Sequence, residues 1–188
     1  MNRPQRWFTI MLWAIVIISL SGEAWQILTV KNNLPFFHTY ILIEYLLLIQ
    51  VFKNIFRESV KKRIWWLLSL GFVLIWVFNV TIGEGWWVFP DYIHILEAII
   101  ILIFISIWFL KMLREKEISN PEQTFEFWMC TGLLVFFSGN FLLFVFTNFL
   151  LKTDMAVYEA IWKVHCILII LLYILYTVAL LWVKKTIK

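Results

Sequence analysis

Residues 91–111 read DYIHILEAIIILIFISIWFLK, and this stretch decides the fold class. After His94 and Glu97 the side chains are apolar up to Lys111, with a single serine among them. A run of about 18 or more apolar residues is long enough to cross the hydrocarbon core of a membrane as one helix. The stretch therefore predicts a transmembrane helix that carries two ionisable side chains near one end.

Five further runs of the same kind occur along the chain. Together they predict six transmembrane helices, at residues 7–30, 36–53, 64–82, 91–111, 123–150 and 158–183. The 188 residues are 63% hydrophobic and 15% charged, and a soluble domain of this size has too little interior for that much apolar surface. We expect an all-α, polytopic helix bundle that forms a single transmembrane domain over residues 1–188.

Basic residues are concentrated on one side of the predicted six-helix zigzag. That side holds Arg3, Arg6, Lys53, Arg57, Lys61, Lys62, Arg63, Lys111, Arg114, Lys116, Lys184, Lys185 and Lys188. The other side holds only Lys31 and Lys152, with Lys163 just inside the sixth span. Positive charge gathers on the cytoplasmic side of membrane proteins, so both termini are expected to be cytoplasmic. The net charge of +4 then sets topology and favours contact with membrane lipids; no nucleic-acid partner is expected.

The first run resembles a secretory signal, because Arg3 and Arg6 precede it. The run continues to Val30, beyond the roughly 7–15 residues of a signal-peptide core, and no small-residue cleavage site follows. We expect an uncleaved first helix. Cys130 and Cys166 are predicted near opposite membrane faces, too far apart for a disulfide, so two free thiols are expected.

Tryptophan favours the membrane–water interface, and ten of the twelve tryptophans fall near the predicted span ends. Trp13 and Trp76 fall deeper and are expected to pack inside the bundle. Asn120 followed by Pro121 predicts the N-cap and first residue of the fifth helix. Gly132 and Gly139, seven residues apart on one face, predict a close approach to a neighbouring helix.

Polar residues from all six predicted helices fall in the half of the membrane away from the basic loops. They include all three histidines, three glutamates and two asparagines. The set is Glu23, His38, Glu44, Asn79, His94, Glu97, Asn140 and His165. An ionised carboxylate that faces lipid near mid-depth costs at least about 2.5–3.5 kcal/mol. We therefore expect Glu23, Glu44 and Glu97 to point into the bundle and the set to form a polar pocket.

Four interpretations of this set remain open. The residues can hold the bundle together by interhelical hydrogen bonds. They can line an outward-facing pocket that binds a small ligand or a proton, which histidine beside carboxylate would make responsive to pH. His94, Glu97 and His165 can bind a metal, or two histidines a haem, since imidazole and carboxylate suit first-row metals. Finally, buried acids also mark paths for protons or small solutes.

Three stretches resemble small, uncharacterised multi-helix membrane proteins of bacteria. They are HTYILIE at 38–44, WMCTGLLVFFSGNF at 128–141 and WKVH at 162–165. Such proteins are associated with sensory modules that accompany signal-transduction kinases, so the resemblance implies a bacterial inner-membrane location and a signalling partner protein. It implies no substrate and no site residue.

The hypothesis favoured at this point is a sensory or ligand-binding membrane protein without catalytic activity and without an expected cofactor. No Ser/His or Asp dyad stands out that would activate a nucleophile or a water molecule. A metal- or haem-binding enzyme and a small-solute or proton transporter are the alternatives.

Overall fold

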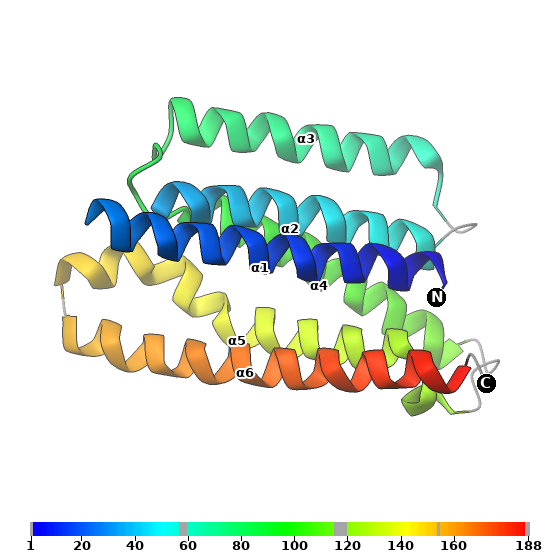
Figure 1. Cartoon of the computed structure of the whole chain (residues 1–188). Coiled ribbons are helices and arrows are strands. Elements are labelled where there is room, and N and C mark those ends of the chain that lie inside the picture. Colours follow the sequence, from blue (N-terminus) through cyan, green and yellow to red (C-terminus); the bar gives the residue numbers. More distant parts are fainter. Residues whose placement is uncertain (1, 57–59, 115–119, 154, 187–188) are drawn as a thin grey trace. The chain divides into compact units, whose positions relative to one another are not determined.

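The computed structural model describes residues 2–56, 60–114, 120–153 and 155–186. Arg57, Lys116 and Lys188, three of the basic residues that set the expected topology, lie outside the described residues. The described part contains six long helices, in chain order (Figure 1) α1 (Arg3–Thr29), α2 (Leu34–Ile55), α3 (Lys62–Thr81), α4 (Asp91–Arg114), α5 (Phe125–Thr153) and α6 (Met155–Thr186). A short 3-10 helix, η1 (Pro121–Gln123), precedes α5.

All six α-helices contain a segment long and apolar enough to cross a membrane. The apolar character is strongest in α4 and α6. The predicted fold class is confirmed: the chain is an all-α, multi-pass membrane protein with six candidate transmembrane helices. The cytoplasmic position of both termini stays a prediction.

Local hydrogen bonds explain where two helices begin. The backbone N–H of Asn2 donates to Oε1 of Gln5 at 2.8 Å. Because this bond satisfies both polar groups, α1 can begin at Arg3, ahead of the predicted apolar run. The prediction for α5 was wrong by one turn. Asn120 precedes η1 instead, and Thr124 caps α5 by accepting a hydrogen bond from the Phe127 N–H at 3.3 Å.

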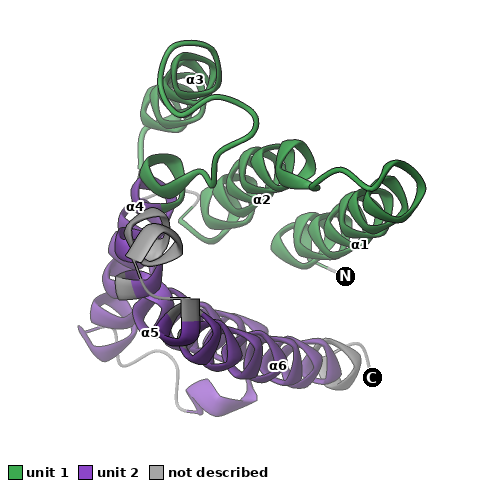
Figure 2. Cartoon of the chain, turned by 90° about the vertical axis from the view of Figure 1, so that its left-hand side faces the viewer, with its two compact units in different colours: residues 1–94 green, residues 95–188 purple. Residues whose placement is uncertain are grey.

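The chain divides into two compact units, Met1–His94 and Ile95–Lys188 (Figure 2). In the first unit, α1 and α2 form a tight hairpin, and a Cβ added at Gly22 would lie 3.1 Å from Cβ of Phe36. Helix α3 contacts α2 at fewer positions. There Tyr45 stacks on Phe72 with ring centroids 3.7 Å apart and donates a hydrogen bond from its hydroxyl to the Leu68 carbonyl at 3.3 Å.

In the second unit, α5 and α6 pack side by side as a second hairpin (Figure 2). Both glycines of α5 face α6. A Cβ at Gly132 would lie 3.2 Å from Cβ of Leu175, and one at Gly139 would lie 2.8 Å from Cδ1 of Leu168. These distances are shorter than ordinary carbon contacts of about 3.5–4.0 Å, so the predicted close helix approach at the two glycines is confirmed.

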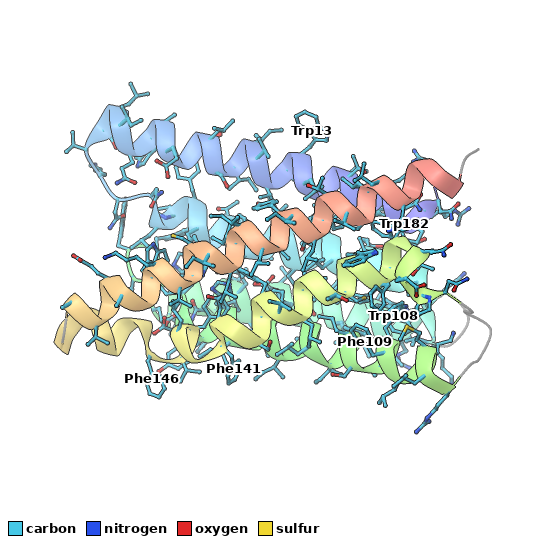
Figure 3. All side chains as sticks on the ribbon, turned by 90° about the horizontal axis from the view of Figure 1, so that it is seen from below. Trp13, Trp108, Phe109, Phe141, Phe146 and Trp182 are labelled. Carbon is cyan, nitrogen blue, oxygen red and sulfur yellow. The ribbon has the colours of Figure 1, made fainter. Side chains whose placement is uncertain are left out.

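The prediction that Trp13 packs inside the bundle is wrong. Trp13 is 67% exposed and points away from the other helices of its unit (Figure 3). Because an α-helix turns about 100° per residue, the buried positions Met11 and Ile15 place Trp13 on the opposite side of α1. The two thiols are free as expected, with Cys130 buried and Cys166 exposed.

Candidate functional site

Seven of the eight predicted site residues are buried, and Glu23 is the exception. The expectation that Glu23 points into the bundle is wrong for the described chain, because its side chain is exposed. The reason lies in its neighbour. Gly22 takes the position on α1 that contacts Phe36 of α2, and the rotation of about 100° to the next residue turns Glu23 away from that contact.

His38 joins α2, α3 and the loop between α3 and α4. Its Nε2 lies 3.0 Å from the Val88 carbonyl oxygen, and Nε1 of Trp76 donates to the His38 carbonyl at 2.9 Å. A carbonyl oxygen can only accept, so Nε2 carries the proton in this bond and Nδ1 of a neutral ring is left as an acceptor. Nδ1 is buried and has no hydrogen-bond partner among the described residues.

Two tryptophans line the same end of the first unit. The Trp86 ring lies edge-on to His38, with centroids 5.8 Å apart, and edge-on to Trp76, with centroids 5.6 Å apart. Trp76 is thus partly buried against α2, as expected for a deep tryptophan. The imidazole of His38 therefore lies beside the Trp86 ring, and Trp76 contacts both Trp86 and the His38 backbone, so these two indoles can report the state of the imidazole.

Glu84 is a member of this region that the sequence did not indicate. Nδ2 of Asn79 donates to Oε2 of Glu84 at 3.0 Å, and the backbone N–H groups of Asp91 and Tyr92 also hydrogen-bond the carboxyl group. Burial raises the pKa of Glu84 above its usual range, and the three hydrogen bonds oppose that rise. Oδ1 of Asn79 is buried without a partner among the described residues. The only sequence signal was a carboxylate between Gly83 and Gly85 in a short loop.

Glu44 lies deeper, about 15 Å along α2 from Leu34 at 1.5 Å per residue. Tyr40, one turn earlier, hydrogen-bonds its carboxyl group, and Glu44 itself is 2% exposed. Oε2 has no hydrogen-bond partner among the described residues. Neither His38 nor Asn79 contributes a hydrogen bond to it within the described part of the chain, so these three residues of the first unit form separate polar points and no single network.

His94 and Glu97 lie one turn apart on α4, as their spacing requires. His94 is buried against Phe37 and Phe89, with ring centroids 5.7 and 6.4 Å away, and Glu97 is fully buried. Both residues have further interactions in the protein. The predicted pair thus occupies one side of α4, where His94 lies beside two phenylalanine rings.

Asn140 and His165 are two predicted residues that the structure brings into direct contact. Nδ1 of His165 lies 2.8 Å from Oδ1 of Asn140, and Nδ2 of Asn140 donates to the Phe136 carbonyl at 2.9 Å. The bond joins α5 to α6 inside the second unit. It is an interhelical polar contact of the kind that the sequence led us to consider.

A metal site was one of the predicted alternatives. Among the residues that the structure describes, no group of three or more His, Cys, Asp or Glu side chains is arranged to hold a metal ion. A groove of about 540 Å³ on the second unit is lined by apolar side chains of α4 and α5 together with Ser106 and Ser138. Both hydroxyls donate to carbonyls of their own helices, and none of the eight predicted residues lines the groove.

Comparison with known proteins adds no assignment. The chain matches no protein-family model, no curated protein and no solved structure. Its function is therefore argued from the buried polar groups of its own helices.

Proposed function

We propose that this protein is a non-enzymatic sensory module of the bacterial cytoplasmic membrane. It binds a small ligand or a proton at buried polar groups in the half of its helices that faces outward, and it transmits the change in helix packing to a signalling partner protein. The residues assigned to binding are His38, Glu44, Asn79, His94, Glu97, Asn140 and His165. Glu23, which is exposed, is retained as a comparison residue and not as part of the site.

The observation that supports this proposal most is Oε2 of Glu44, a buried carboxyl oxygen that has no hydrogen-bond partner among the residues that the structure describes. A buried polar atom without a hydrogen bond costs about 1–3 kcal/mol, and Oε2 of Glu44 carries that cost far from either end of α2. His38 Nδ1 and Asn79 Oδ1 add two more such atoms in the same unit. A protein that only needed a stable bundle would gain stability from apolar residues at these positions, whereas a binding module needs groups that a ligand or proton can satisfy.

The proposal is tested by the response of the indoles to pH and by two matched substitutions. We expect purified protein in lipid nanodiscs to show a reversible change in tryptophan fluorescence between about pH 5 and 8, the range in which histidine titrates. Glu44→Gln should abolish or shift this change while the protein keeps its helical circular dichroism. Glu23→Gln should leave it intact, because Glu23 is exposed.

Two outcomes contradict the proposal. One is a wild-type protein whose fluorescence and near-UV circular dichroism do not change with pH. The other is a change that Glu44→Gln and Glu23→Gln affect equally, which would assign it to general electrostatics and not to the buried carboxyl group.

A further inference from the structure

His165 lies in an aromatic niche formed by α5 and α6. The ring centroids of Trp162, Phe136 and Phe144 are 4.6, 5.9 and 6.3 Å from that of the imidazole. His165 is 6% exposed and Trp162 is half-buried, whereas Phe136 and Phe144 are buried, so the accessible side of the niche is the one that Trp162 forms. The residue is near one end of the apolar segment Trp162–Trp182, which places the niche at the edge of the hydrocarbon region.

The direction of two hydrogen bonds fixes which ring nitrogen is the acceptor. Nδ2 of Asn140 donates to the Phe136 carbonyl, so Oδ1 is the atom that the amide presents to His165. An amide oxygen can only accept, and Nδ1 of His165 must therefore carry the proton. The lone pair of a neutral imidazole is then on Nε2. Among the residues that the structure describes, none hydrogen-bonds to Nε2.

We propose that Nε2 of His165 accepts a hydrogen bond from the hydroxyl group of a membrane-soluble aromatic ligand of the phenol or hydroquinone class. The ligand must carry a hydrogen-bond donor because Nε2 offers only a lone pair. The aromatic body is favoured because Trp162, which is half-buried beside the imidazole, presents part of an indole ring on which a further ring stacks. The ligand comes from the membrane because the niche lies in an apolar span. This inference rests on the proposed function, for which it names a ligand class.

Asn140 is a positioning residue in this scheme. Its carbonyl holds the imidazole in one tautomer and one orientation, as outer-sphere partners do for histidines that bind metals. A metal ion itself fits the niche less well, because the described residues provide no group of three or more candidate ligands around it. A single hydroxyl donor needs no second protein ligand.

The test uses the full chain in nanodiscs, labelled with nitrogen-15 in its histidines. The probe is trimethylhydroquinone, kept reduced under argon, and its matched control is the dimethyl ether, which has the same ring but no donor. The hydroquinone should bind saturably, move the Nε2 resonance of His165, and bind about tenfold more tightly than the ether, as expected for one buried hydrogen bond.

Three variants localise the binding. His165→Asn places an amide N–H near the Nδ1 position, where it can still donate to Asn140, and leaves no acceptor at the Nε2 position. It should weaken hydroquinone binding about tenfold while leaving ether binding unchanged. Trp162→Leu removes the half-buried ring beside the imidazole and should weaken both probes. Phe146→Leu is the control, since Phe146 is 48% exposed and points away from the helices (Figure 3); binding of both probes should be unchanged.

The inference is overturned by any of three results: an Nε2 that carries the proton in the free protein, equal affinity for hydroquinone and ether, or hydroquinone binding that His165→Asn does not weaken. None of these results bears on the pH response of Glu44, which belongs to the other unit. A retained Glu44 response with a failed hydroquinone titration would remove the ligand class and leave the proposed function standing.

Discussion

Replacing a glycine of the α5–α6 contact by alanine should destabilise the protein, whereas the same replacement at a glycine in open surroundings should stabilise it. Gly71 of α3 has no atom within 4 Å of where a Cβ would lie. Gly71→Ala therefore gains only the better helix propensity of alanine, about 1 kcal/mol of stability. A Cβ at Gly132 would lie 3.2 Å from Cβ of Leu175, an atom that is fixed to the backbone and cannot rotate away.

The net effect at Gly132 follows from two opposing quantities. Overpacking of this kind costs about 1–3 kcal/mol, and the helix propensity returns about 1 kcal/mol. Gly132→Ala should therefore destabilise the protein by about 0–2 kcal/mol relative to wild type. At Gly139 the close atom is a terminal methyl of Leu168, at 2.8 Å. Leu168→Ala removes that methyl group, so it should reverse the destabilisation that Gly139→Ala causes.

The assay is reversible unfolding in mixed micelles, where increasing SDS is followed by far-UV circular dichroism. Gly71→Ala, Gly132→Ala, Gly139→Ala and the pair Gly139→Ala with Leu168→Ala are compared with wild type and with Leu168→Ala alone. If Gly132→Ala stabilises the protein as much as Gly71→Ala does, α5 and α6 do not approach as closely as the distances require, and the reasoning fails.

The remaining predictions concern hydrogen bonding, pH and access. A double-mutant cycle of Asn140→Leu and His165→Leu should give a coupling free energy of about 0.6–2 kcal/mol, measured by the same unfolding; a value near zero would mean that the bond does not hold the hairpin. Burial raises the pKa of Glu84, so between its ordinary and its raised value the folded protein keeps a proton that the unfolded chain has released. Stability should fall as pH rises through that window, and Glu84→Gln should flatten the slope; an unchanged slope would contradict this. A membrane-permeant maleimide should label Cys166 in the folded protein and Cys130 only after unfolding, because Cys166 is exposed and Cys130 is buried. Mass spectrometry measures the labelling, and a Cys130 that is labelled in the folded protein would contradict the prediction.

Hydropathy predicted the helices well because membrane crossing depends on length and composition, which are local properties. The first helix begins earlier than the apolar run, at Arg3, since a helix continues into water wherever its backbone is satisfied. The fifth begins later than Asn120 because Thr124, which the Asn120–Pro121 pattern did not indicate, accepts the capping hydrogen bond. Errors of this kind are confined to one turn.

The candidate site was less accessible to sequence reasoning, because depth in a membrane says nothing about direction around a helix. Glu23 and Glu44 are both predicted to lie in the half of the membrane away from the basic loops. Yet Glu23 is exposed, whereas Glu44 is buried. The difference comes from Gly22, whose contact with Phe36 sets the rotation of α1. Glu84 escaped notice because its role depends on a loop that returns to Asn79 and to the start of α4.

Two hydrogen bonds between α2 and α3 end on main-chain oxygens, from the Tyr45 hydroxyl to Leu68 and from the Trp76 indole to His38. Every residue of a helix supplies such an oxygen, so the accepting position can change its side chain without losing the bond. The donating ring cannot. Diverged copies of this chain would then keep a hydroxyl or indole at positions 45 and 76 while position 68 drifts, a one-sided pattern that pairwise covariation would miss.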